Sequence, residues 1–275
     1  MKIDSHQHFW NYDPAKYSWI NDSMYRIRKD FLPSNLEPVL QRAGIDGTVA
    51  VEAFHSERET EFLLALASEF QFIKGVVGWV DLYSEDAGQR LKHFSENAVF
   101  KGVRHTVYDD KGAYLTNPTF LKGIGELKKY GLTYDILIFE QQLPGAIDLV
   151  KIFPEQPFVL DHMAKPQISS EGPSQEWINN MEELGSFENV YCKLSGLVTE
   201  TPEFQWEPSD FLPFLEVVFN SFGKDRLMYG SDWPVSLSAA SYQDTLNIIY
   251  DFFASSGEET TNKIFGGNAV KFYSL

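Results

Sequence analysis

Residues 47–82 read GTVAVEAFHSERETEFLLALASEFQFIKGVVGWVDL, and their pattern decides the fold. An apolar run rich in β-branched residues, GTVAVEAF (47–54), precedes the helical pattern ETEFLLALASEF (59–70). A second apolar run, KGVVGWVDL (74–82), follows it. Nearly continuous apolar strands joined by a helix are typical of a parallel sheet whose faces are covered by helices. The segment therefore predicts a strand–helix–strand unit.

The same alternation extends over the whole chain. Six further apolar runs resemble strands, namely KIDSHQHF (2–9), FKGVRHTV (100–107), LTYDILIF (132–139), PFVLDHMA (157–164), NVYCKLSG (189–196) and RLMYGSDW (226–233). Eight strand–helix units in a chain of this length predict a single (β/α)8 barrel over residues 1–275. An open doubly wound sheet is the alternative, but the Gly-x-Gly-x-x-Gly pattern of its dinucleotide-binding form does not follow the first strand. We expect no nucleotide cofactor, and the tail from Glu258 predicts a last helix that packs on the barrel.

The composition limits the classes of partner. The chain has 23 basic and 39 acidic side chains and a formal net charge of −16, which disfavours binding to nucleic acid and to anionic membranes. A single cysteine, Cys192, excludes an internal disulfide framework and a cysteine-based zinc cluster. The first residues lack an apolar signal region, so we expect a cytoplasmic protein with no membrane span. The sequence leaves open whether the chain forms a homo-oligomer.

Polar side chains concentrate where the predicted strands end. In a parallel barrel these carboxyl ends form the mouth at which active sites lie. His6 and His8 end the first strand and point to the same side, because side chains alternate along a strand. The other strand ends contribute Glu52, Trp79, Asp81, Arg104, His105, Asp161, His162, Lys193, Ser195, Ser231, Asp232 and Trp233.

Four of these residues form the most informative group: His6, His8, His162 and Asp232. They come from strands one, six and eight, and we expect them to converge on one mouth. Imidazole nitrogens and a carboxylate suit zinc, manganese or another first-row divalent ion. The same four residues can also activate a water molecule without a metal, with the carboxylate as base.

Several neighbouring residues have two interpretations. Glu52 and Asp81 can contact a substrate or cap the following helix, and Lys193 can contact a substrate or complete an ion pair inside the barrel. Alternation places Asp161 opposite His162, so we expect it to face the helices. We expect purely structural roles for His55 and His93.

Aromatic residues near the mouth also have two interpretations. Trp10 and Trp233 can form walls of a sugar pocket or belong to the core. The long connection from Trp10 to Pro33 can cover an active site or pack as a surface loop.

Longer motifs give the chain a family resemblance. KGVRH (101–105), FVLDHMAKP (158–166), VYCKLSGL (190–197) and RLMYGSDWPV (226–235) accompany the His-x-His of strand one. In this order the motifs resemble the amidohydrolase superfamily, and within it the sugar-lactonase branch of L-fuconolactonase and L-rhamnonolactonase. The resemblance runs from end to end of the chain and implies hydrolysis of a sugar-acid lactone to the aldonic acid.

The resemblance also implies roles for individual residues. Asp232 would be the catalytic base, His6, His8 and His162 would surround the reacting centre, and Arg104 and His105 would contact the substrate. Two-metal members of the superfamily use a lysine on strand four and a histidine on strand five. Here Lys101 lies at the other end of strand four, and LTYDILIF has no histidine. We therefore expect no two-metal centre, and the resemblance leaves open whether one divalent ion is needed.

Two other functions remain as alternatives. A metal-dependent decarboxylase or C–C hydrolase of the same superfamily would use the same histidines and Asp232 to bind an essential ion. A carbohydrate-binding protein with an inactive barrel would account for the aromatic content.

Overall fold

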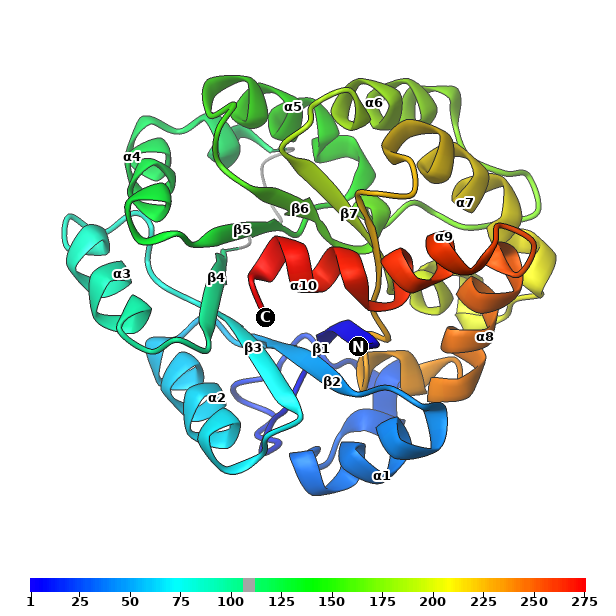
Figure 1. The fold of residues 1–275 in the computed structure, drawn as a ribbon, viewed down its shortest axis with the longest axis horizontal. Coiled ribbons are helices and arrows are strands. Elements are labelled where there is room, and N and C mark those ends of the chain that lie inside the picture. The colour runs from blue at the N-terminus through cyan, green and yellow to red at the C-terminus, as the bar shows by residue number, and fades with distance from the viewer. Residues whose placement is uncertain (106–111) are drawn as a thin grey trace.

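Eight parallel strands form one sheet and follow each other in chain order (Figure 1). The computed structural model describes residues 1–105 and 112–275. The strands are β1 (Ile3–Gln7), β2 (Gly47–Val51), β3 (Ile73–Gly78), β4 (Phe100–Arg104), β5 (Thr133–Ile136), β6 (Phe158–Leu160), β7 (Val190–Leu194) and β8 (Leu227–Tyr229). This order and direction are those of the predicted (β/α)8 barrel and exclude the doubly wound alternative.

The barrel is nearly closed between β8 and β1. Ser5 Oγ donates a hydrogen bond of 2.6 Å to the Tyr229 carbonyl, and the Asp232 N–H donates one of 2.9 Å to the His6 carbonyl. A parallel bridge pairs Gln7 with Trp233 just beyond the strand ends. These contacts bring the first and last strand segments together, and with them His6 and Asp232.

Helices follow the strands and surround the sheet (Figure 1). They are α1 (Pro33–Ala43), α2 (Glu57–Glu69), α3 (Ala87–Ser95), α4 (Pro118–Leu127), α5 (Leu143–Ile152), α6 (Gln175–Gly185), α7 (Pro208–Phe222), α8 (Tyr242–Phe253), α9 (Glu258–Asn262) and α10 (Asn268–Tyr273). Side-chain caps start several of them, as at Ser56, Ser174 and Ser241, each of which accepts a backbone N–H of the first turn. None of the helices among the described residues is long and apolar enough to span a bilayer.

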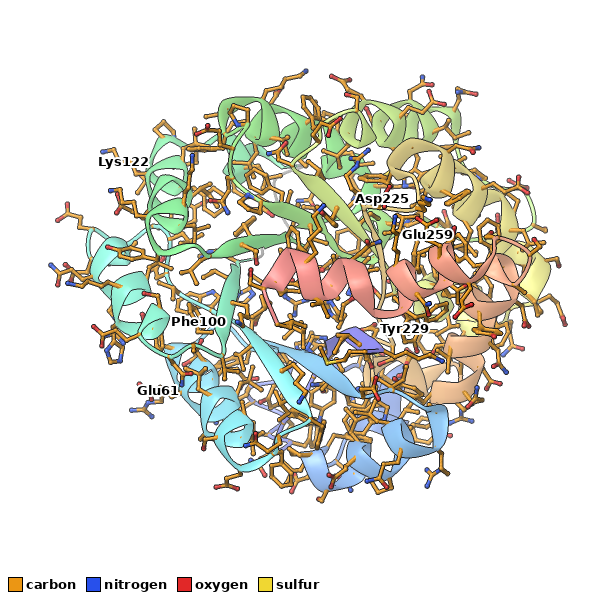
Figure 2. The ribbon with its side chains drawn as sticks, viewed as in Figure 1. Glu61, Phe100, Lys122, Asp225, Tyr229 and Glu259 are labelled. Atoms are coloured by element: carbon orange, nitrogen blue, oxygen red, sulfur yellow. The ribbon has the colours of Figure 1, made fainter. Side chains whose placement is uncertain are left out.

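Apolar side chains fill the space between sheet and helices (Figure 2). Phe100 of β4 and Tyr229 of β8 are buried, whereas the Glu61 and Lys122 side chains point outward from α2 and α4. Burying each large aliphatic or aromatic side chain contributes about 1.5–3 kcal/mol. This core fixes the strand ends on which the polar mouth is built.

The C-terminal segment covers the amino-terminal end of the barrel. α10 lies across the centre of the barrel in the view of Figure 1. Its Ala269, Phe272 and Tyr273 join a buried cluster with Ile3 and other strand residues. The prediction of a last helix packed on the barrel is thus confirmed.

The strands end earlier than predicted. β2 ends at Val51 rather than residue 54, and β8 ends at Tyr229 rather than residue 233. Each predicted run continues to an aromatic residue, Phe54 or Trp233, so hydropathy alone does not mark the point where the chain leaves the ladder. In the predicted strand 100–107, residues 106 and 107 lie outside the described part. Most of the predicted site residues therefore lie just after strands rather than within them.

The long connection from Trp10 to Pro33 fits both interpretations. Trp10 and Phe31 form an antiparallel bridge, and the short 3-10 helical segment Asp22–Ile27 lies between them. Tyr17 and Ile20 are buried in the core, whereas other side chains of the same loop reach the barrel mouth.

Candidate active site

A cavity of about 610 Å³ opens at the carboxyl ends of the strands. One side of it is polar and contains His8, Glu52, Arg104, His162 and Asp232. The remaining wall is mostly apolar and comes from the loops that follow the strands. It consists of Trp19, Asn21, Met24, Ala53, Phe54, His55, Leu137, Phe139, Lys165, Thr199, Glu200, Phe204 and Val235.

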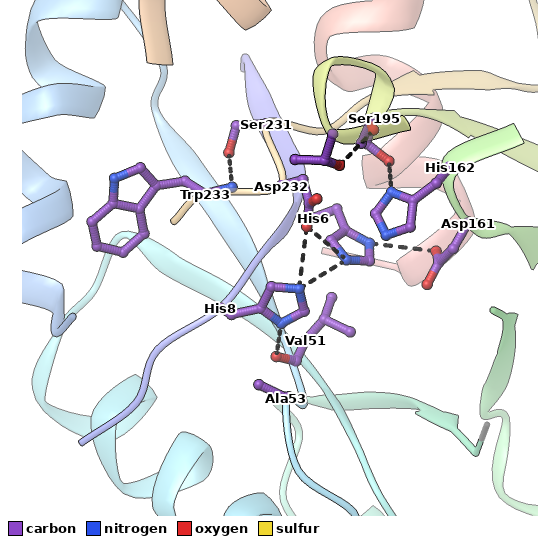
Figure 3. Close-up of polar contacts among 12 residues, drawn as sticks. His6, His8, Val51, Ala53, Asp161, His162, Ser195, Ser231, Asp232 and Trp233 are labelled. Atoms are coloured by element: carbon purple, nitrogen blue, oxygen red, sulfur yellow. Dashed lines mark hydrogen bonds and ion pairs between the residues drawn. The ribbon is translucent and has the colours of Figure 1, made fainter. Parts of the chain in front are cut away.

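His6 of β1 and His8, which follows the strand, face each other on the polar side (Figure 3). Because side chains alternate along the strand, His6 and His8 project to the same side, and their Nε2 atoms are 3.2 Å apart. The Nδ1 atom of His8 lies 2.8 Å from the Val51 carbonyl, to which it can only donate. This contact fixes the His8 ring and turns its Nε2 atom toward His6 and Asp232. His6 is fully buried beneath it.

Asp232 and His162 reach the same place from loops in unusual conformations. Asp232 has φ 53°, and His162 begins a run of four left-handed residues that ends at Lys165. Non-glycine residues in this region are strained, and such strain is often found at functional sites. Asp232 Oδ1 lies 3.4 Å from His8 Nε2 and 3.8 Å from His6 Nε2, and His162 Nδ1 lies 2.8 Å from Ser195 Oγ (Figure 3).

A buried layer of ion pairs lies behind the histidines. Arg104 donates to Glu52 Oε1 at 2.8 Å and to Asp161 Oδ2 at 3.1 Å, and it also contacts the Glu52 carbonyl. Lys193 Nζ lies 2.9 Å from Asp161 Oδ1 and 2.6 Å from Asp135 Oδ2. Buried charges are tolerated when they are paired in this way.

Asp161 does not lie on the side of the strand that alternation predicts. It was expected to face the helices, but it lies inside the barrel, fully buried, 3.4 Å from His6 Nδ1. The alternation argument fails here because β6 ends at Leu160 and the backbone turns left-handed at His162. Both Asp161 and His162 can therefore point toward the centre.

The surroundings set the charges of the site at neutral pH. Burial lowers the pKa of His162 to about 4 and lowers the pKa of His6 well below its ordinary value. Burial alone would raise the pKa of Asp232, but the imidazoles of His162, His8 and His6 outweigh it and hold that pKa below its usual range. Asp232 is therefore a carboxylate beside the uncharged imidazoles of His162 and His6, and a carboxylate is the state that a general base requires.

The donor atoms fit a divalent metal ion. His6 Nε2, His8 Nε2 and Asp232 Oδ1 lie between 3.2 and 3.8 Å from one another. Ligands of a tetrahedral first-row ion with bonds of about 2.05 Å are roughly 3.3 Å apart. His6, Asp161 and His162 form a second, overlapping group of possible ligands.

The predicted substrate-binding residues divide into two sets. Glu52 and Arg104 line the cavity. His105 and Lys193 are buried and do not line it within the described part of the chain; His105 stacks on Trp79 at 5.5 Å, and Lys193 forms the ion pairs described above. The ion-pair interpretation of Lys193 therefore fits the structure better than direct substrate contact.

Trp10 and Trp233 also lie behind the lining rather than in it. Trp10 is fully buried, donates from Nε1 to the Lys29 carbonyl and packs against Tyr17. Trp233 is buried against Phe31, with ring centroids 5.1 Å apart. Their indoles are large enough to anchor the long loop, and the structure assigns both to the core.

Other lining residues were missed by the sequence analysis. Lys165 and Glu200 form an ion pair of 2.5 Å at the cavity wall, and no motif in the sequence connects them. His55, for which a structural role was expected, lines the cavity, whereas His93 is exposed on α3. The position of His55 just after β2 was the only available signal, because such loops form the mouth of a barrel.

Lys101 on β4 and Asp135 on β5 each have a polar partner in the structure. Lys101 Nζ donates to the Ser274 carbonyl at the opposite end of the barrel. Asp135 accepts a hydrogen bond from Lys193 Nζ.

Comparisons with known proteins agree with this geometry. The chain is 35% identical to an L-fucono-1,5-lactonase of Burkholderia ambifaria, over 100% of this chain and 96% of that protein. An L-rhamnono-gamma-lactonase of Scheffersomyces stipitis is 24% identical over 68% of this chain and 62% of its own length.

A solved structure extends the comparison to the fold. The crystal structure of an amidohydrolase of Burkholderia multivorans with bound zinc matches with a TM-score of 0.96 and 34% identity, over 100% of this chain and 99% of that one. The family model described as amidohydrolase matches residues 3–275. Barrel, cavity and relatives agree with the resemblance of the sequence motifs, and the chain belongs to the amidohydrolase family.

Proposed function

We propose that this amidohydrolase opens a sugar-acid lactone to the aldonic acid, with Asp232 as the base that activates water. The observation that carries the proposal is the Asp232 carboxylate, which lines the cavity and lies 3.4 Å from His8 Nε2. The relatives named L-fucono-1,5-lactonase support the substrate class.

Lactone hydrolysis needs two proton transfers, and one carboxylate can make both. Asp232 takes a proton as water attacks the lactone carbonyl, and it returns the proton to the ring oxygen when the tetrahedral intermediate collapses. His8 Nε2 and His6 Nε2 flank the carboxylate on one side, at 3.4 and 3.8 Å. The low pKa of Asp232 keeps it ionised before the attack.

Charge on the carbonyl oxygen must be offset during the attack. A divalent ion held by His6, His8 and Asp232, of which zinc and manganese are our candidates, would supply Lewis-acid polarisation when bound. Among the chain's own groups, Arg104 lines the cavity and is permanently charged, although Glu52 and Asp161 already engage part of its guanidinium.

The apolar wall favours a deoxy sugar. Phe54, Leu137, Phe139, Phe204 and Val235 present apolar side chains to the cavity. A C6 methyl group buries favourably against such a wall, whereas a C6 hydroxyl there would lose hydrogen bonds to water. We therefore expect a preference for 6-deoxy aldonolactones such as L-fuconolactone or L-rhamnonolactone over their 6-hydroxy counterparts.

The test is a screen of L- and D-aldonolactones that follows acid release, with the protein as purified, metal-stripped and metal-supplied. We expect turnover of at least one 6-deoxy lactone, above the spontaneous rate. Absence of turnover on every lactone contradicts the proposal. Turnover of a carboxylated aromatic substrate that depends strictly on a metal would favour the alternative, a decarboxylase or C–C hydrolase.

A further inference from the structure

The C-terminal helix reaches the buried layer of the active site through one hydroxyl group. Tyr273, in the last turn of α10, is 2% exposed, and its hydroxyl donates a hydrogen bond of 2.8 Å to Asp135 Oδ2. α10 covers the amino-terminal end of the barrel (Figure 1), whereas the cavity lies at the carboxyl ends of the strands. Tyr273 thus approaches the site from below, while the substrate cavity opens above it.

Asp135 passes this contact on to a lysine. Its Oδ2 atom accepts both the Tyr273 hydroxyl and the Lys193 ammonium, the latter at 2.6 Å. The ammonium also lies 5.6 Å from the centroid of the Tyr273 ring. Asp135 and Lys193 are fully buried, so water does not compete for these bonds.

Lys193 in turn holds the histidine that faces the catalytic carboxylate. Its Nζ atom lies 3.1 Å from His6 Nδ1, and the opposite nitrogen of the ring, Nε2, faces His8 and Asp232. The His6 ring is therefore fixed between a polar contact below and the reacting centre above. Groups behind a catalytic residue that fix its ring orientation often affect the reaction strongly without touching the substrate.

We propose that Tyr273 is a positioning residue, which acts through Asp135 and Lys193 to fix the His6 ring against Asp232. The hydroxyl shares the Asp135 carboxylate with Lys193. Without it, the carboxylate attracts the ammonium more strongly, and the ammonium moves away from His6. This inference rests on the proposed function for its kinetic readout, but it concerns a contact that exists independently of the substrate.

The test compares Tyr273→Phe with a matched control. Tyr191→Phe removes a hydroxyl from the same cluster, because the Tyr191 ring packs on Phe272 with centroids 4.8 Å apart. Within the described residues, the Tyr191 hydroxyl bonds neither Asp135 nor Lys193. The phenylalanine ring keeps the packing in both variants.

We expect Tyr273→Phe to lower kcat about fivefold, the loss that corresponds to one hydrogen bond. KM stays unchanged because Tyr273 is remote from the cavity, and Tyr191→Phe keeps the wild-type kcat. Asp135→Asn, which removes the shared charge, lowers kcat at least as much and gives a second comparison. A residue with only a structural role would lower Tm and leave kcat intact below Tm.

A spectroscopic readout makes the test independent of turnover. The chain has 6 histidines, so the ring nitrogens of His6 can be followed by ¹⁵N NMR and assigned by their loss in His6→Gln. We expect these signals to shift in Tyr273→Phe and not in Tyr191→Phe. Unchanged His6 signals, an unchanged kcat, or an equal loss of kcat in both variants overturns the proposal. If the wild type opens no lactone, the proposed function fails, and the His6 signals alone decide on Tyr273.

Discussion

At the residue scale, the site depends on side chains held by strained or tightly packed backbone. His6 and His8 could be predicted from the alternation of one strand, and the structure places them as expected. The position of Asp161 inside the barrel could not be predicted, because the left-handed turn that begins at His162 contains no glycine and has no signature in the sequence. The pairing of Asp135 with Lys193 and Tyr273 joins residues far apart in the chain and depends on how the barrel closes.

Gly196 provides a test at this scale. It has φ +70°, and a Cβ atom added there would lie 2.6 Å from His162 Nδ1. We expect Gly196→Ala to displace the His162 ring and to lower kcat/KM at least about tenfold, a loss of about 1.4 kcal/mol. Steady-state kinetics on the best lactone measures this loss.

Gly44→Ala is the matched control for backbone strain. Gly44 has φ +67°, but an added Cβ atom there meets nothing within 4 Å. Both variants therefore lose stability of about 1 kcal/mol from the positive φ, whereas only Gly196→Ala loses activity. Equal kcat/KM values in the two variants would argue against a role of His162 in the reaction.

At the scale of elements, hydropathy predicted where strands and helices lie better than where strands end. The alternation of apolar runs with amphipathic segments reflects burial, which the barrel satisfies along its whole length. Strand ends depend on hydrogen bonds to neighbouring strands, which a single segment does not contain. The loops after the strands therefore held the surprises, among them His55 and the ion pair of Lys165 with Glu200.

Helix α2 carries a buried carboxyl group that makes stability depend on pH. Burial and the nearby Glu52 raise the pKa of Glu59 from 4.5 to about 7, although Tyr17 donates a hydrogen bond to it. Because the folded protein binds this proton more tightly than the unfolded chain, the free energy of unfolding falls as pH rises through that window. Between about pH 5 and about pH 8, titration of Glu59 should lower the free energy of unfolding of the wild type by about 2 kcal/mol. We expect the Glu59→Gln variant to lack this decrease.

Chemical denaturation at the two pH values measures the difference. Glu61→Gln is the control, because Glu61 lies on the exposed face of the same helix (Figure 2). The stability of the Glu61→Gln variant should depend on pH as that of the wild type does. If Glu59→Gln and the wild type lose equal stability with rising pH, Glu59 does not titrate in this window.

At the scale of the whole molecule, the barrel places two opposite ends in contact with one reaction centre. Loops at the carboxyl ends form the cavity, and α10 supports the buried layer from the amino-terminal end. The fold could be predicted because eight similar units repeat along the chain and each is visible locally. The support from α10 could not be predicted from the sequence, since it depends on closure of the barrel around Asp135 and Lys193.

The central claim is that Asp232 activates the water that opens the lactone. Asp232→Asn keeps the size of the side chain and its contacts but removes the basic carboxylate. The direct measurement is kcat on the best lactone, with circular dichroism and Tm confirming a folded variant. The account predicts that kcat falls by at least about 10³-fold, within the range for loss of a general base. A folded Asp232→Asn protein that opens the lactone at close to the wild-type rate would contradict it.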